Sequence, residues 1–184
     1  MRILVRAMLV GVLGLAGCSS STTAGPGPSA SPAVSGASQF GGTDRAWIEL
    51  NIAMDEELLP LLALAPQRGG PGVRAVAAEV TAVINAELGT LRELRDQAGL
   101  PTTNPHKGMS MPGMVTPEQV SKAAALTGKS FDALVVEAVK AHLTQGETLA
   151  KSETKSGADP RTRALAAEIL RSRQATRSKI TNMS

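Results

Sequence analysis

The sequence predicts an all-α domain, and two observations support this fold class. Only 2% of the 184 residues are aromatic, and a core so poor in aromatic side chains is usually built from Ala, Leu and Val on packed helices. Apolar residues also recur at helical spacing in four long stretches of the chain. These stretches form two similar pairs, which predicts a four-helix bundle made of two duplicated helical hairpins.

The first hairpin should span residues 44–98. Its first helix is expected from Asp44 to Leu64, where Pro60 should kink the helix or end it early, and residues 66–71 should form a turn. The second helix should continue to Ala98, because Gly99-Leu100-Pro101 stops it. The expected apolar stripes are Leu50, Met54, Leu58 and Leu61 in the first helix, and Val76, Val80, Ile84, Leu88, Leu91 and Leu94 in the second.

A crossover should join the two hairpins. Residues 102–115 read as a Met-rich loop, and Thr116, Pro117 and Gln119 have the pattern of a helix start, with threonine at the cap and glutamine three residues later. The short helix that begins there should end at Gly128.

The second hairpin should begin with a long helix over residues 131–156. The face of this helix carries Val135, Ala138, Val139, His142, Gly146 and Leu149. Asp159-Pro160 should cap the last helix, whose apolar face of Leu165, Ile169 and Ile180 fades toward its end.

The two hairpins are similar in sequence. Residues 74–80, RAVAAEV, match residues 163–169, RALAAEI. Upstream, Asp44, Glu49 and Met54 correspond to Asp132, Glu137 and His142 if the intervening turn differs by one residue. Neither hairpin could bury its apolar face alone, so we expect the two to close on each other.

The N-terminus predicts an exported lipoprotein. Arg2 and Arg6 precede an apolar run over residues 7–15, which is too short to span a bilayer and is typical of a secretory signal. The run ends in Leu15-Ala16-Gly17-Cys18, which resembles the bacterial lipobox. We therefore expect cleavage before Cys18 and lipidation of Cys18, with palmitate among its acyl chains. The alternative is an ordinary signal peptide that a chance cysteine follows.

This leader sets the predicted domain organisation. Residues 1–17 are the signal peptide, and residues 18–42 are the lipidated cysteine and a flexible stalk of Ser, Thr, Ala, Gly and Pro. Residues 43–184 form the bundle, which is long enough for one domain. The expected location is the extracytoplasmic face of the cell membrane.

Composition excludes several classes of function. The chain has one cysteine, which excludes a disulfide framework and a thiolate metal cluster. Its net charge of +3 includes Arg2 and Arg6, so the processed chain is nearly neutral and has no nucleic-acid footprint. Residues 44–66 are acidic and residues 159–184 are basic, which indicates either two mutually attracting helices or, as a second reading, a last helix that faces anionic lipid.

Several of these motifs, in this order, resemble the DUF305 family. They are the two Ala-Ala-Glu segments, the loop Met109-Ser110-Met111-Pro112-Gly113-Met114 and the entrance Gly128-Lys129-Ser130-Phe131-Asp132. The resemblance covers residues 44–180 and implies a ferritin-like four-helix bundle of the bacterial envelope; the related DUF4142 family is the second choice. DUF305 members usually carry a His-His pair in the first helix of each hairpin, and some bind copper through His and Met.

This chain departs from that family pattern. The His-His positions fall at Met54-Asp55 and at His142-Leu143, so one histidine of four survives. The family's Gln-x-x-Glu in the second helix of each hairpin survives only as Glu87, and its counterpart falls near Thr176. Glu87 borders an apolar stripe, where a snorkelling or hydrogen-bonded surface carboxylate is expected.

The best soft-ligand cluster in the sequence is His106, Met109, Met111 and Met114, all in the crossover loop. Thioethers suit Cu(I) or Ag(I), and a flexible loop could fold around one ion with the imidazole completing the set. The alternative is that these methionines plug the open end of the bundle as apolar filler.

A second and weaker Cu(I) site pairs His142 with Met54. These residues occupy equivalent places in the two hairpins and could approach each other across the core, although core packing is the favoured interpretation for both. A di-iron centre is excluded by its ligand pattern, because no Glu-x-x-His occurs in the chain. No nucleophile motif or phosphate loop is present either, so no enzyme is expected.

Two functional hypotheses follow. In the first, the protein is a membrane-anchored envelope lipoprotein that binds or sequesters Cu(I) through its Met-rich loop. In the second, it is a non-catalytic interaction or structural module of the envelope, with a degenerate metal site and an envelope protein as its partner.

Overall fold

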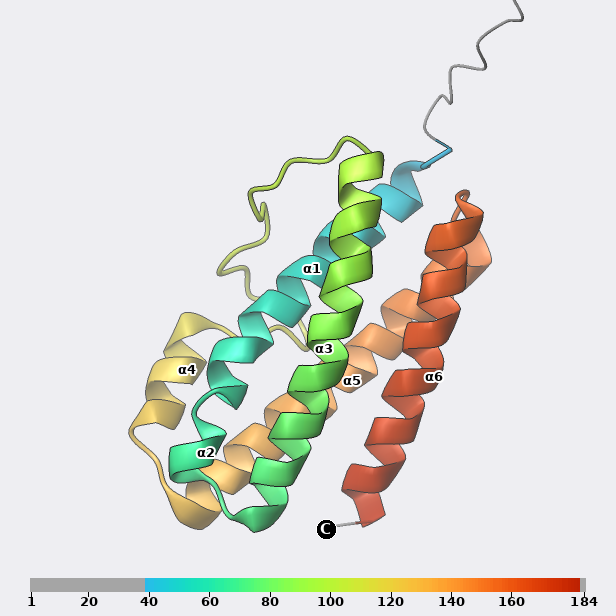
Figure 1. Cartoon of the computed structure of the whole chain (residues 1–184). Coiled ribbons are helices and arrows are strands. Elements are labelled where there is room, and N and C mark those ends of the chain that lie inside the picture. The colour runs from blue at the N-terminus through green and yellow to red at the C-terminus, as the bar shows by residue number, and fades with distance from the viewer. Residues whose placement is uncertain (1–38, 183–184) are drawn as a thin grey trace, which may run out of the picture. The chain divides into compact units, whose positions relative to one another are not determined.

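The computed structural model describes residues 39–182, in which all of the regular secondary structure is helical (Figure 1). The predicted leader, Cys18 and nearly all of the stalk lie outside the described residues. The helices are α1 (Gly42–Leu62), α2 (Ala65–Arg68), α3 (Pro71–Gln97), α4 (Pro117–Ala124), α5 (Gly128–Ser156) and α6 (Pro160–Asn182). The all-α prediction is confirmed.

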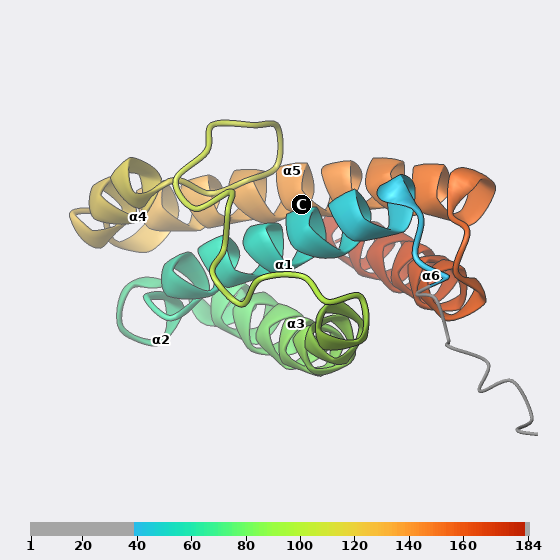
Figure 2. The same cartoon turned by 90° about the horizontal axis from the view of Figure 1, so that it is seen from above.

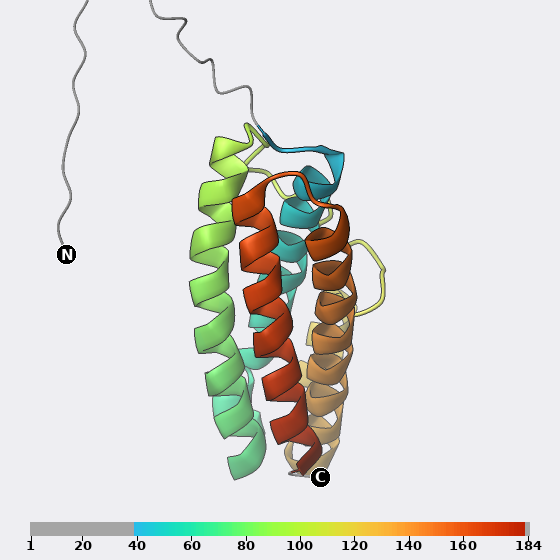
Figure 3. The ribbon, with the colours of Figure 1, turned by 90° about the vertical axis from the view of Figure 1, so that its right-hand side faces the viewer.

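The four long helices α1, α3, α5 and α6 run side by side as a bundle (Figures 1 and 3). Helices α1 and α3 form one hairpin, which α2 closes, and α5 and α6 form the other. Between the hairpins, the crossover loop passes over α1 to the side of α5 before it reaches α4 (Figure 2). This path brings the Met-rich loop against both α1 and α5.

Each long helix buries one face in a common core. The predicted stripe of α3 is buried along its whole length, whereas Leu50 on the stripe of α1 is only partly buried and Trp47, Ile48 and Ile52 take its place inside. Side chains with essentially no exposed surface include Leu58, Leu61, Ile84, Leu91, Phe131, Val135, Val139 and Ile169. Phe40 is also buried, so the packed domain begins before residue 43, where the sequence placed its start.

Most helix boundaries follow the predicted signals. Thr116 accepts a hydrogen bond from the Gln119 amide at 3.3 Å, and the Gln119 side chain accepts one from the Thr116 amide at 2.9 Å, as expected for a capping box. Asp159 caps α6 through the amides of Arg161 and Thr162. Gly99 follows α3 with a φ of +64°, a backbone conformation that favours glycine.

Three boundaries differ from the predictions. Helix α1 continues through Pro60 and ends two residues later, at Leu62. Residues 65–68 form the short helix α2 where a turn was expected. Helix α4 ends at Ala124 rather than Gly128, because Gly128 instead opens α5.

Two aspartates join the hairpins reciprocally. Asp44 of α1 accepts hydrogen bonds from the amides of Ala158 and Asp159, in the turn between α5 and α6. Asp132 of α5 accepts one from the amide of Gly70, in the turn before α3, at 2.9 Å. The two aspartates occupy equivalent positions in the two hairpins, and each one binds the turn of the other hairpin. This symmetry supports a duplicated hairpin.

Glu153 of α5 is fully buried beside Asp44. Burial raises the pKa of Glu153 to about 8, and a hydrogen bond and the charge of Asp44 act in the same direction. For Asp44, burial acts to raise the pKa, but hydrogen bonds from Glu153 and from three backbone amides hold it below its ordinary value. The pair therefore shares one proton at neutral pH, and Glu153 carries it.

This pair should make stability depend on pH. The pKa of Glu153 is about 8 in the folded protein, against an ordinary value of 4.5. Its contribution to the free energy of unfolding is therefore full below pH 4.5 and is lost as the pH rises through 8. In the wild type, the free energy of unfolding should fall by up to about 1 kcal/mol per pH unit within this window. Glu153→Gln should abolish this fall. Denaturant unfolding of both proteins from pH 5 to pH 9 measures the difference, and parallel pH curves would contradict it.

Candidate functional site

A layer of titratable side chains lies in the middle of the bundle, and each long helix contributes one of them. These are Asp55 from α1, Glu87 from α3, His142 from α5 and Arg173 from α6, and we call them the central polar layer. All four are buried; Glu87, the most exposed of them, shows 8% of its surface. Since charged residues are almost never buried without a partner, their contacts with one another define the site.

The guanidinium of Arg173 holds this layer together. Its Nη2 atom lies 3.1 Å from Oδ1 of Asp55 and 2.7 Å from Oε2 of Glu87. Its Nη1 atom donates a further hydrogen bond of 3.4 Å to Oε1 of Glu87. Gly146 of α5 leaves room for the side chain, because a Cβ there would lie only 3.0 Å from Nε of Arg173. One planar cation thereby joins α6 to both α1 and α3.

His142 completes the layer as a neutral imidazole. Its Nε2 atom lies 3.3 Å from Oδ1 of Asp55, and its ring also faces the backbone of Gly113 in the crossover loop. Burial lowers the pKa of His142, and the positive charge of Arg173 lowers it further, whereas Asp55 acts in the opposite direction. The ring is therefore directed at the acceptors Asp55 and Gly113, as in a core histidine.

Glu87 lies where the layer meets the surface. It lines a groove of about 320 Å³ between α3 and α6, together with Glu168. Burial raises the pKa of Glu87 to about 7, although the charge of Arg173 acts to lower it. The expectation of a surface carboxylate was wrong, because the packing of α6 on α3 covers this side chain and supplies Arg173 as its partner.

A cluster of methionines lies apart from the main core. Met54 of α1 and Met114 of the crossover loop are buried against each other and Ala53, and Met111 packs against them from a partly exposed position. We call Met54, Met111 and Met114 the methionine cluster. The structure therefore brings Met54, from the weaker predicted site, together with Met111 and Met114, from the stronger one.

The other two predicted loop ligands lie outside this cluster. Met109 is the most exposed large apolar side chain in the described residues, at 44%, and its amide donates to the His106 carbonyl in a turn. Of the four predicted loop ligands, Met111 and Met114 thus lie in the methionine cluster, whereas Met109 is exposed and His106 is partly buried.

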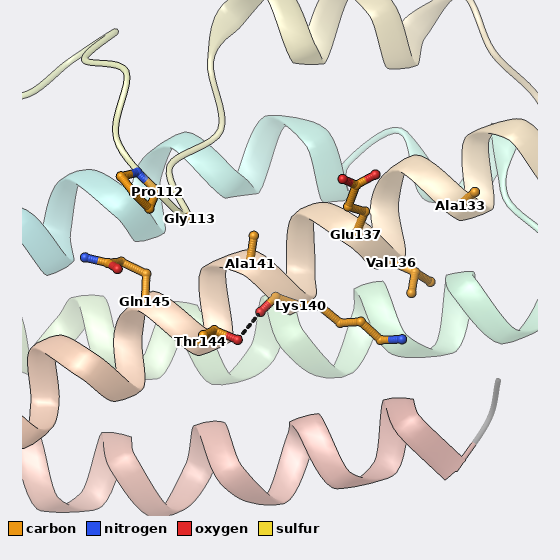
Figure 4. A pocket seen from close by; sticks show the side chains of 9 residues that line it. All are labelled: Pro112, Gly113, Ala133, Val136, Glu137, Lys140, Ala141, Thr144 and Gln145. Atoms are coloured by element: carbon orange, nitrogen blue, oxygen red, sulfur yellow. Dashed lines mark hydrogen bonds between the residues drawn. The ribbon is translucent and has the colours of Figure 1, made fainter.

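Gly113 fixes the loop beside the bundle. It has a φ of +77°, and a Cβ at this position would lie 2.8 Å from the carbonyl oxygen of Ala141 on α5. Glycine is thus required both by its backbone conformation and by the close approach of the loop to the helix. Figure 4 shows Pro112 and Gly113 above Ala141 and Gln145. This contact places Met114 against α1 and covers His142.

The two groups of residues differ in what they could bind. Within residues 39–182, no three His, Cys, Asp or Glu side chains are placed to hold one metal ion. The central polar layer does not fit a metal, because the guanidinium of Arg173 already supplies a cation to both carboxylates. The methionine cluster does fit a soft ion, because it offers uncharged thioethers at a partly exposed edge.

Sequence reasoning missed Asp55 and Arg173 as members of the site. A signal for Arg173 was present, because it follows Ile169 by four residues and so falls on the predicted apolar face of the last helix. A charged residue on such a face indicates a buried partner. The partner itself could not be identified, because Asp55 lies on a helix 118 residues away.

Comparisons with known proteins agree with this architecture. The family model DUF305, a domain of unknown function, matches residues 57–184. Among solved structures, the chain is similar to a DUF305 protein from Streptomyces coelicolor that is thought to be secreted, with 18% identity, a TM-score of 0.68, and coverage of 77% of this chain and 91% of that one. A DUF305 fragment from Deinococcus radiodurans is similar at 13% identity, with a TM-score of 0.68 and coverage of 78% and 96%.

At these identities the structural similarity concerns the fold alone. No curated protein matches the chain. The family model nevertheless covers well over half of the sequence, including the last six residues of α1 and all of α3, α5 and α6. Of the two families that the motifs resemble, the match is to DUF305, and the chain belongs to the DUF305 family.

Proposed function

We propose that this chain is an envelope protein, anchored by lipid on Cys18, that binds Cu(I) through the thioethers of its methionine cluster. The observation that carries the proposal is the convergence of Met54, on α1, with Met111 and Met114, on the crossover loop. These residues come from two distant segments and form a group of their own beside the larger leucine-rich core.

The chemistry of the cluster suits a soft monovalent ion. Thioethers are uncharged donors that favour Cu(I) over hard divalent ions, and Cu(I) accepts two to four ligands. The partly exposed Met111 gives an ion a path to the buried sulfurs. We expect the exposed Met109 and the partly buried His106 of the same turn to make the first contact with an ion in solution. His142 is assigned to the central polar layer instead, because its Nε2 atom faces Asp55.

The location rests on the N-terminal sequence. The lipobox-like Leu15-Ala16-Gly17-Cys18 and its apolar run are typical of a lipoprotein leader. The Streptomyces relative is thought to be secreted. Within the described residues, none of the helices is both long and apolar enough to cross a membrane. An anchored bundle on the outer side of the cell membrane is consistent with these observations.

A Cu(I) titration of the purified protein against a competing chromogenic chelator tests the proposal. The decisive variant changes Met54, Met111 and Met114 together to leucine, which removes the sulfurs but nearly preserves the side-chain volume. Loss of a group that only supports a metal ligand typically costs about 10–100-fold in metal affinity, so loss of three ligands should weaken Cu(I) binding at least that much.

Met109→Leu is the matched control, because its sulfur lies outside the methionine cluster. We expect this variant to keep most of the affinity at equilibrium. Equal affinity of the wild type and the triple variant for Cu(I) would exclude the methionine cluster as the binding site.

The second candidate function is a non-catalytic interaction module, and Arg173 favours it. An internal guanidinium occupies the middle of the bundle and pairs with both carboxylates, which makes this layer structural. If the wild type and the triple methionine variant both bind Cu(I) equally and weakly, the interaction module becomes the better description of the protein.

A further inference from the structure

An apolar groove runs along the outer face of α5. It has a volume of about 760 Å³, and the loop residues Pro112 and Gly113 form one end of its wall (Figure 4). The face of α5 that lines it consists of Ala133, Val136, Glu137, Lys140, Ala141, Thr144 and Gln145. Four of these residues are exposed and the other three are partly exposed, so within the described chain this face is open except where Pro112 and Gly113 lie at one end of it.

The residues of the groove are arranged so that the face matches itself. If a second α5 lies antiparallel to the first, with a twofold axis at the level of Ala138 and Val139, six of the seven α5 positions meet another position of the same groove. The pairs are then Ala133 with Thr144, Val136 with Ala141, and Glu137 with Lys140. The last pair occurs twice, once on each side of the axis, and each time it brings opposite charges together.

We propose that the groove seats α5 of a second copy of this chain, antiparallel about a twofold axis. The two Glu137–Lys140 pairs select this register and direction, because a parallel arrangement would place like residues side by side. The alanines on the face allow the two helix backbones to approach closely. This proposal does not rest on Cu(I) binding, since none of Met54, Met111 and Met114 lines the groove.

The expected association is weak. Stable complexes bury about 800 Å² of surface on each partner, and a contact through one helix face buries less than this. Lipid anchoring on Cys18 would hold copies on one surface and raise their effective concentration. In solution we therefore expect a concentration-dependent equilibrium of monomer and dimer rather than a permanent dimer.

Sedimentation equilibrium of the purified protein over a wide concentration range tests this proposal. Glu137→Lys makes the charges of the face entirely basic, and Lys140→Glu makes them entirely acidic. Each single variant should dimerise at least about tenfold more weakly than the wild type, because like charges then meet across the axis. The double variant, which exchanges the two charges, should recover dimerisation.

Mixing the two single variants gives the sharpest result. Each should be monomeric alone, but the basic and acidic faces should form a heterodimer when combined. Arg171→Glu, at an exposed position on α6, is the control and should leave dimerisation unchanged. A wild-type chain that stays monomeric at every concentration would overturn the proposal and leave the groove to a different protein. Single variants that fail to combine, or a double variant no better than the singles, would overturn it as well.

Discussion

Replacing Arg173 by methionine is expected to lower the free energy of unfolding by about 3–5 kcal/mol, because it leaves Asp55 and Glu87 buried without their cation. Arg173 lies within 3.1 Å of one carboxylate and 2.7 Å of the other, and 1% of its surface is exposed. Methionine keeps much of the side-chain length, so the lost ion pairs rather than a cavity should dominate the effect. Urea unfolding followed by circular dichroism measures the change.

Two further variants separate the electrostatic cause from a general effect on α6. Arg171→Met, at an exposed position two residues away, should change the free energy of unfolding by no more than about 0.5 kcal/mol. Adding Asp55→Asn and Glu87→Gln to Arg173→Met should restore part of the lost stability, because no unpaired charge then remains buried. If Arg173→Met and Arg171→Met were equally stable, the guanidinium would have no structural role.

The same substitution should also change the titration of His142. Burial and, after it, the positive charge of Arg173 hold the pKa of His142 below its ordinary value. In Arg173→Met the positive charge is gone while Asp55 remains 3.3 Å away, so the pKa of His142 should rise. NMR titration of the imidazole protons provides this second readout, which a merely disordered variant would not reproduce.

Replacing Asp44 by alanine should produce the second large effect, a loss of about 2–4 kcal/mol in the free energy of unfolding. Its carboxylate accepts hydrogen bonds from the amides of Gly41, Ala158 and Asp159 at 2.6, 3.1 and 3.0 Å. Alanine leaves these donors without a partner at the point where the start of α1 meets the turn between α5 and α6. Thermal and urea unfolding measure the loss.

The equivalent aspartate of the second hairpin provides the comparison. Asp132 accepts one backbone hydrogen bond, from Gly70, and is only partly buried. Asp132→Ala should therefore cost about 1 kcal/mol, clearly less than Asp44→Ala. A larger loss for Asp132 than for Asp44 would show that the number of hydrogen bonds does not determine the cost.

Local sequence signals predicted most of the helices. The periodic stripe of α3 is buried throughout, and the capping signals at Thr116 and Asp159 mark the starts of α4 and α6. The errors occurred where competing signals lie close together. Pro60 indicates a helix end, but α1 continues for two residues beyond it.

The candidate site was predicted only in part. Met54, Met111 and Met114 were all named, but in two separate sites, and the exposed Met109 was joined to a cluster that does not include it. Proximity along a loop does not decide which side chains the loop turns toward the bundle. Here the direction of the loop side chains depends on Gly113, which holds the loop against α5 at Ala141.

By itself, the sequence determined that the chain is helical, that its two hairpins are related and that it belongs with the DUF305 proteins. These properties depend on spacing within a helix and on short motifs, which are local in the chain. Only the tertiary structure decided that Asp55, Glu87, His142 and Arg173 meet in one layer and that Met54 joins the loop methionines. Helical periodicity specifies which face a residue occupies, whereas the partner across the core depends on how far each helix is shifted along its neighbours. That shift is set by the packing of the whole bundle.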